Sequence, residues 1–239
     1  MAMTLALTCA PGELRAGRWS ARAVVALSVA YAAAMIGGFV SLGNLRDPLP
    51  DPYLAVAEVL ILLMAPFVVA LMAVVNVGAP VRARLFGLLA FGWMLVAGSM
   101  TMTVHVVELV VARRVDPGTV PGFPRLFDFA WPSMLYAVDV VAWDLLLGLS
   151  LLCAAAVFAG HGYRWVRRGL LLSGGLCLVG LVGPATGALE WRAIGIFGYA
   201  VVFPLTCLPL SRAFAAPSTG PNELVSDSAS TGHLVSDRP

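Results

Sequence analysis

The segment 101-TMTVHVVELVVARR-114 places two ionisable side chains, His105 and Glu108, inside an otherwise apolar run. Residues three apart share one face of an α-helix, so the imidazole and the carboxyl group lie close together. An ionisable group in hydrocarbon costs on the order of 2.5–3.5 kcal/mol by insertion scales, and such groups usually face the interior of a helix bundle or a water-filled cavity. The pair therefore marks a candidate site for proton transfer.

Three further acids, Glu58, Asp139 and Asp144, lie in apolar stretches. At a rise of about 1.5 Å per residue, Glu58, Glu108 and Asp139 lie roughly 7, 6 and 9 Å below the outer ends of their helices. Asp144 lies deeper, close to the middle of the membrane. Three helices are therefore expected to bring acids to one level. Asp139 and Asp144 are five residues apart, about 140° around an α-helix, and need not share a face.

No arginine falls within the apolar spans, so we expect these acids to have no buried basic partner other than His105. Because desolvation without a counter-ion disfavours the ionised form, at least one acid should be neutral at pH 7 and able to donate a proton. Two structural alternatives remain open. Glu58 and Glu108 can reach headgroups or water, and His105 can join two helices through a hydrogen bond. No recognised metal-ligand spacing is present, so no metal site is expected.

Aromatic side chains are expected near the level of the acids. They are Tyr136, Trp143, Trp93 and Tyr199. The π face of an aromatic ring stabilises positive charge, so acids beside such rings suit chemistry that passes through a cation. Together with Asp144, these four residues are the predicted substrate-binding set. The alternative for each ring is that it fills the core of the bundle.

The composition is that of a polytopic membrane protein. Of the 239 residues, 60% are hydrophobic and 12% charged, and the mean hydropathy is +0.90. A soluble domain of this length needs more charge to cover its surface. A membrane-spanning helix takes about 20 apolar residues, which predicts six spans, with a seventh possible. The predicted spans are 23–42, 54–77, 85–112, 133–159, 169–188 and 193–211.

The expected fold is an all-α transmembrane bundle over residues 23–212, preceded by a cytoplasmic segment, 1–22, and followed by a disordered cytoplasmic tail, 213–239. Nine arginines fall on the side of the two termini and five on the other side, which places both termini in the cytoplasm. The net charge of +2 gives no reason to expect nucleic acid. The four cysteines lack metal or disulfide spacing, and no nucleotide, hydrolase or dinucleotide motif is present. No cofactor is therefore expected.

Three stretches resemble a group of bacterial polytopic membrane proteins described only as hypothetical. They are 51-DPYLAVAEVLILLMAPFVVALMAV-74, 103-TVHVVELVVARR-114 and 132-PSMLYAVDVVAWDLLLGLSLL-152. The resemblance covers most of residues 20–212 and implies a multi-pass protein of the bacterial cytoplasmic membrane. It implies no function.

A looser resemblance is to the integral-membrane terpene cyclases of meroterpenoid and indole-sesquiterpenoid biosynthesis. It implies a small helical enzyme that protonates an alkene or epoxide with a carboxylic acid inside the membrane, and it places Glu58 at the family's early glutamate. The family's late acid has only Glu190 as a counterpart here, at a loop edge, and the family is drawn with seven helices. Glu58 alone is therefore carried over.

Three functions are compared. In the first, a lipophilic, prenylated substrate enters laterally from the bilayer, Glu58 or Asp139 is the general acid, and Glu108, oriented by His105, removes the final proton. The second is a proton- or cation-coupled transporter that uses the acids as a relay. The third is a non-catalytic membrane partner that acts through the inner arginines and the tail. The expected partners are the substrate and membrane lipids, without nucleic acid, and no particular oligomeric state is predicted.

Overall fold

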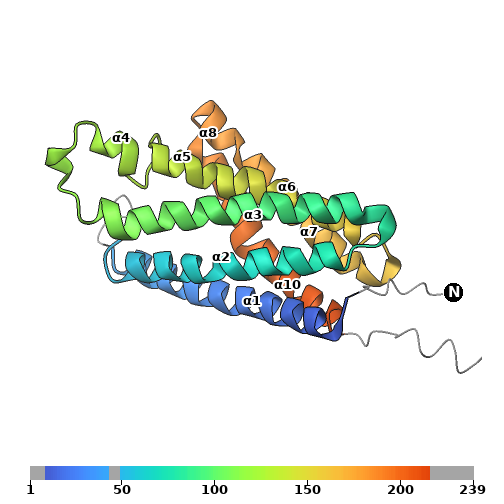
Figure 1. The fold of residues 1–239 in the computed structure, drawn as a ribbon. Helices are drawn as coiled ribbons and strands as arrows, with labels where there is room; N and C mark the ends of the chain where they lie inside the picture. The colour runs from blue at the N-terminus through green and yellow to red at the C-terminus, as the bar shows by residue number, and fades with distance from the viewer. Residues whose placement is uncertain (1–8, 43–48, 216–239) are drawn as a thin grey trace, which may run out of the picture.

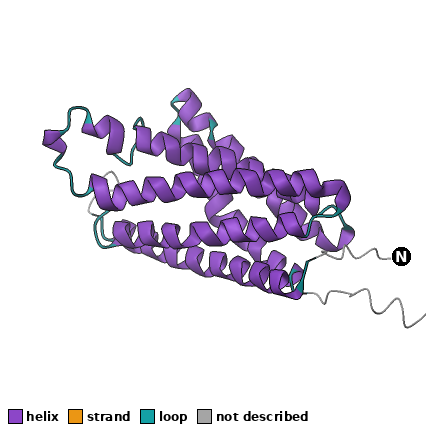
Figure 2. Ribbon diagram, viewed as in Figure 1, coloured by secondary structure: helices purple, strands orange, loops and turns teal. Residues whose placement is uncertain are grey.

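The computed structural model describes residues 9–42 and 49–215, and every regular element in these ranges is helical (Figure 2). Six helical segments are long and apolar enough to cross a membrane. The predicted all-α bundle with six spans and a multi-pass architecture is confirmed. Most of the predicted disordered tail, from residue 216 onward, lies outside the described residues.

The first half of the chain forms three spans and a segment that connects the third to the fourth. Its elements are α1 (Pro11–Val40), α2 (Tyr53–Val77), the short turn η1 (Val81–Ala83), α3 (Arg84–Val106), the π-helical turn η2 (Val107–Ala112), the short turn η3 (Pro117–Thr119) and α4 (Phe123–Phe127). The helix α1 begins earlier than the predicted residue 23. Pro11 opens it, and the Glu13 side chain accepts a hydrogen bond from the Ala10 N–H, which satisfies a donor at the helix start.

The second half forms three more spans, each assembled from consecutive helical pieces. The fourth span consists of α5 (Met134–Val140), the π-helical turn η4 (Val141–Leu146) and α6 (Leu147–Val157). The fifth consists of η5 (His161–Tyr163), α7 (Arg164–Gly180) and α8 (Val182–Thr186). The sixth consists of η6 (Leu189–Trp191), α9 (Arg192–Phe197), the π-helical turn η7 (Gly198–Val202) and α10 (Phe203–Ala213).

The spans form a closed ring. In it α1 packs on α2, α2 on α3, α3 on α6 and α6 on α7, and α10 closes the ring between α7 and α1. The start of α1 and the end of α10 lie at one end of the bundle, and α4 lies at the other (Figure 1). We call the end of the bundle at which α4 lies the cap end. An even number of spans returns the chain to its starting side, so both termini share one side.

The two ends of the bundle have different interiors. Toward the termini the core is apolar, and its fully buried side chains include Leu71, Met72, Leu151, Leu170 and Leu210. Toward the cap end the interior holds buried acids, a histidine and an arginine. Large apolar side chains on the outside, such as Ile36, Leu63 and Leu205, are exposed, as lipid-facing positions require.

Candidate functional site

His105 lies between two carboxyl groups from two other helices. Its Nδ1 is hydrogen-bonded to Oε2 of Glu58, on α2, and its Nε2 lies 3.6 Å from Oδ1 of Asp139, on α5. The His105 side chain is 1% exposed. Glu58, His105 and Asp139 therefore meet, because α2, α3 and α5 pass the cap end side by side. The common level expected for the acids Glu58, Glu108 and Asp139 stays a prediction.

Arg192 connects Asp139 to Asp144, and it was missed by the sequence analysis. Its Nη2 donates to Oδ2 of Asp139 at 3.0 Å and its Nε to Oδ2 of Asp144 at 3.3 Å. Arg192 is 4% exposed, so the expectation that the acids have no buried basic partner other than His105 was wrong. The residue was assigned to the loop before 193. The sixth span begins earlier, at Leu189, and Arg192 is the first residue of α9.

A signal for Arg192 existed in the sequence. Unpaired buried charges are costly, so four acids in apolar spans called for a cation. Among the arginines placed on the outer side, Arg113 and Arg192 directly adjoin predicted spans, 85–112 and 193–211, at the outer end above the acids. The direction of the Arg192 side chain could not be derived from the sequence, because the rotation of a helix about its own axis depends on neighbouring helices.

Asp139 and Asp144 reach the same guanidinium because of a π-helical turn. In a regular α-helix they would be about 140° apart. The turn Val141–Leu146 has the wider i→i+5 pattern, which reduces the angle between positions five apart. Glu108 and Tyr199 also lie in π-helical turns, η2 and η7. Three such turns therefore border the cluster, and π-helical turns occur frequently at functional sites.

Two glycines make room for the Asp144 carboxyl group. A Cβ atom built on Gly195 would lie 2.3 Å from Oδ1 of Asp144, and one built on Gly180 would lie 2.7 Å from the Cα of Gly195. The backbones of α7 and α9 therefore approach closely, and the carboxyl group fits where they cross. Gly180 lies in the glycine-rich stretch 174–187.

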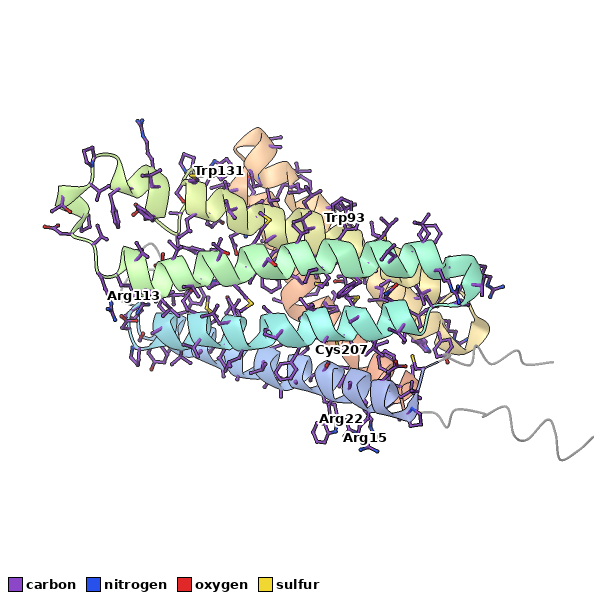
Figure 3. All side chains as sticks on the ribbon, viewed as in Figure 1. Arg15, Arg22, Trp93, Arg113, Trp131 and Cys207 are labelled. Carbon is purple, nitrogen blue, oxygen red and sulfur yellow. The ribbon has the colours of Figure 1, made fainter. Side chains whose placement is uncertain are left out.

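Several aromatic residues surround the cluster. The guanidinium of Arg192 lies 4.2 Å from the centre of the Tyr136 ring, and the Trp143 and Tyr199 rings are 5.1 Å apart. Trp93 does not join them. It is 37% exposed on the surface of α3 (Figure 3), and its place in the predicted substrate-binding set stays a prediction.

Glu108 is buried but lacks the partner that was expected for it. The predicted hydrogen bond by which His105 would orient Glu108 is absent among the described residues, because His105 turns to Glu58 on the facing helix. Oε2 of Glu108 has no hydrogen-bond partner among those residues, and the same holds for Nε2 of His105 and Oδ1 of Asp139. Buried polar atoms are rarely left unpaired. Their clustering beside His105 therefore indicates a place where another polar group can bind.

The charges in the cluster do not balance when every acid is ionised. The buried acids Glu58, Glu108, Asp139 and Asp144 face one buried guanidinium, Arg192, and one imidazole, His105, while the arginine near Glu108, Arg113, is already paired with Asp51. Four negative charges against at most two positive ones would leave a net charge of −2 in a desolvated interior, which is costly. The cluster reaches neutrality only when it holds additional protons or a cation. Stored protons are what acid–base chemistry needs.

A small crevice lies beside the cluster, on its apolar side. It is lined by Ala65, Val68, Met94, Ala97, Gly98, Thr101, Ala142, Trp143 and Leu147. Thr101 precedes His105 by four residues, so the two share a face of α3. Among the described residues, no group of three or more His, Cys, Asp or Glu side chains is arranged to hold a metal ion.

Comparisons with protein-family models, with curated proteins and with solved structures find no match. The resemblance to hypothetical bacterial membrane proteins and to integral-membrane terpene cyclases therefore stays a prediction. The function has to be argued from the site itself.

Proposed function

We propose that the protein is an integral-membrane enzyme that transfers protons to and from a lipophilic substrate at His105. The observation that carries the proposal is the position of this imidazole. One ring nitrogen is held by Glu58, and the other faces a carboxylate oxygen of Asp139 without a hydrogen bond. Histidine is the side chain most often used for general acid–base catalysis.

Each residue of the cluster has a separate role in this proposal. Glu58 fixes the ring orientation through Nδ1, which leaves Nε2 to give or take the proton at the substrate. The general acid is thus the Glu58–His105 pair, in place of a lone carboxylic acid on Glu58 or Asp139. Arg192 positions Asp139. Glu108, with its free Oε2, is placed to receive a proton from the substrate.

The proposed reaction is a cyclisation of a prenylated substrate. A proton adds to an alkene or epoxide, the resulting cation closes a ring, and loss of a proton restores neutrality, so that the product is an isomer of the substrate. The rings of Tyr136, Trp143 and Tyr199 lie beside the cluster and can stabilise the cation.

Two alternatives have less support. A transporter needs a polar path toward the termini. The buried hydroxyl groups instead donate to backbone carbonyl groups. Ser150 and Ser173 bond to neighbouring spans and so fix the packing of helices, and Thr206 bonds within its own helical span. A partner protein acting through its tail predicts that deletion of residues 216–239 abolishes its effect, whereas the enzyme proposal predicts little change.

The experiment is a product screen. Membranes that contain the full-length protein are incubated with farnesylated and epoxy-farnesylated aromatic acceptors, and extracts are compared by mass spectrometry. We expect a new isomer of unchanged mass that is lost in Glu58→Gln and in His105→Gln. Glu190→Gln is the matched control, because Glu190 is an exposed acid outside the cluster. The absence of any isomer with well-folded protein, or an isomer that persists in both cluster variants, contradicts the proposal.

A further inference from the structure

The cluster is covered at the cap end by three aromatic rings from one stretch of chain, Phe129, Trp131 and Tyr136, which we call the aromatic cap. The Phe129 ring centre lies 5.9 Å from that of His105 and 5.6 Å from that of Tyr136. The Trp131 ring lies 6.4 Å from that of Tyr136. Phe129 is therefore the aromatic ring that covers the imidazole itself.

Phe129 has one side toward His105 and another toward the surroundings. It is 36% exposed, whereas His105 behind it is 1% exposed. Among the described residues, Phe129 thus lies between the buried imidazole and the outside at this end. In the opposite direction the interior is closed by the apolar core that includes Leu71 and Leu151.

The position of Phe129 is held by a neighbouring serine. The Ser133 Oγ donates to the backbone carbonyl of Asp128 and accepts from the Tyr136 N–H at 3.1 Å, where it caps the start of α5. The residue just before Phe129 is therefore tied to the helix that carries Asp139. The neighbouring helix α4 packs mainly on α5 and η3. Phe129 itself packs on His105 and Tyr136 and keeps an exposed side.

We propose that Phe129 is the residue that controls access to His105, and that a reactant reaches the imidazole from the cap end by displacing this ring. The route differs from the lateral one expected from the sequence. It requires the reactive head of the substrate to arrive at the level of the lipid headgroups. The size of the opening left by the displaced Phe129 ring then determines which reactants can reach His105.

The test measures access to His105 with a small electrophile and needs no substrate. Full-length protein in lipid nanodiscs is treated with diethyl pyrocarbonate, which acylates imidazole nitrogen, and the rate at each of the 3 histidines is followed by peptide mass spectrometry. In the wild type, we expect His105 to react far more slowly than in a synthetic peptide of residues 101–114. Phe129→Ala should accelerate its reaction about tenfold, because the cover is removed. Phe129→Trp should keep the wild-type rate.

Phe127→Ala is the matched control. Phe127 lies in the same segment but packs on Phe123, at 5.2 Å between ring centres, so its loss should leave the His105 rate unchanged. A wild-type rate in Phe129→Ala, or equal acceleration in Phe127→Ala, overturns the proposal. If Phe129→Ala accelerates all histidines and is thus unfolded, Phe129→Leu and Ser133→Ala decide. One of them must accelerate His105 selectively, and otherwise the proposal fails.

The inference rests on the proposed function only in taking His105 as the group that the substrate must reach. The two can fail separately. If Phe129 protects His105 from acylation but the screen yields no product, the access role of Phe129 is supported and the proposed enzyme activity is contradicted. If a product forms but Phe129 substitutions do not change acylation, the enzyme activity is supported and the access role is contradicted.

Discussion

Arg192 holds two carboxylates at once, and this depends on its shape. A guanidinium presents several N–H donors in a fixed plane, whereas a lysine ammonium is a compact charge on a flexible stem. Nε and Nη2 of Arg192 point to different acids, Asp144 and Asp139. Removal of one member of a buried ion pair leaves the other charge uncompensated, which costs more than the pair itself contributes.

Arg192→Met is therefore expected to destabilise the protein by about 3–5 kcal/mol, because it leaves two buried acids without their counter-charge. Arg192→Lys should recover part of this loss, since an ammonium can serve one of the acids. The measurement is equilibrium unfolding in mixed detergent micelles. Arg125→Met, at an exposed position of α4, is the control and should change stability little. Equal losses of stability in the two methionine variants would show that Arg192 stabilises the protein no more than the exposed Arg125 does.

The hydrogen bond between Glu58 and His105 should appear as an energetic coupling. Hydrogen bonds that involve charged groups contribute about 1.5–3 kcal/mol, so we expect a coupling of about this size between Glu58→Gln and His105→Gln in a double-mutant cycle of unfolding free energies. Glu190→Gln combined with His105→Gln should be additive. Additivity of the first pair would mean that the two side chains do not act together.

At the scale of the elements, helix geometry brings the acids together. The turn η4 directs Asp139 and Asp144 to one guanidinium, and the Gly180–Gly195 contact lets α7 and α9 approach until the Asp144 carboxyl group fits between them. Neither helix could come so close with a larger side chain at the contact, because core atoms are packed at crystal-like density.

Gly195→Ala should test this close approach. The new methyl group would lie 2.3 Å from Oδ1 of Asp144, so the acid or the helix must shift. We expect a loss of about 1–3 kcal/mol, as for other overpacked sites, measured as the free energy of unfolding. Gly175→Ala is the matched control on α7, where nothing lies within 4 Å of the added Cβ. This control should be neutral or more stable by about 0.5–1 kcal/mol, since alanine favours the helix. A neutral Gly195→Ala would refute the tight contact.

At the scale of the whole molecule, polarity is divided along the bundle. The buried charges lie toward the cap end, the apolar core lies toward the end where α1 begins and α10 ends, and large apolar side chains are exposed on the outside. In a bilayer, this arrangement keeps the charges within reach of the headgroup level while the apolar core seals the other side.

The topology prediction places both termini in the cytoplasm and the segment between α3 and α5 outside. Reporter fusions can check it. Alkaline phosphatase, active only outside the cytoplasm, should be active when fused after Gly118 and inactive when fused after the last residue. A green fluorescent protein at the last residue should fluoresce. The opposite pattern of reporter activity would show that the distribution of arginines predicts the wrong orientation for this protein.

Much of the architecture follows from the sequence alone. Apolar runs of about 20 residues locate six spans, because hydrocarbon admits only helices with internally bonded backbones in a chain of this type. The depths of Glu58, His105 and Asp139 also follow, since the rise per residue of a helix is constant. The position of a residue along the axis of its helix can therefore be counted from one sequence.

Rotation about each axis was decided only by the tertiary structure. The pairing of His105 with Glu58 in place of Glu108, the inward direction of Arg192 and the outward direction of Trp93 all depend on which neighbouring helix each face meets. The π-helical turn Val141–Leu146, which contains Asp144, has no residue signature in the sequence. Contacts between helices distant in the sequence determine these angles, and the proposed chemistry depends on them.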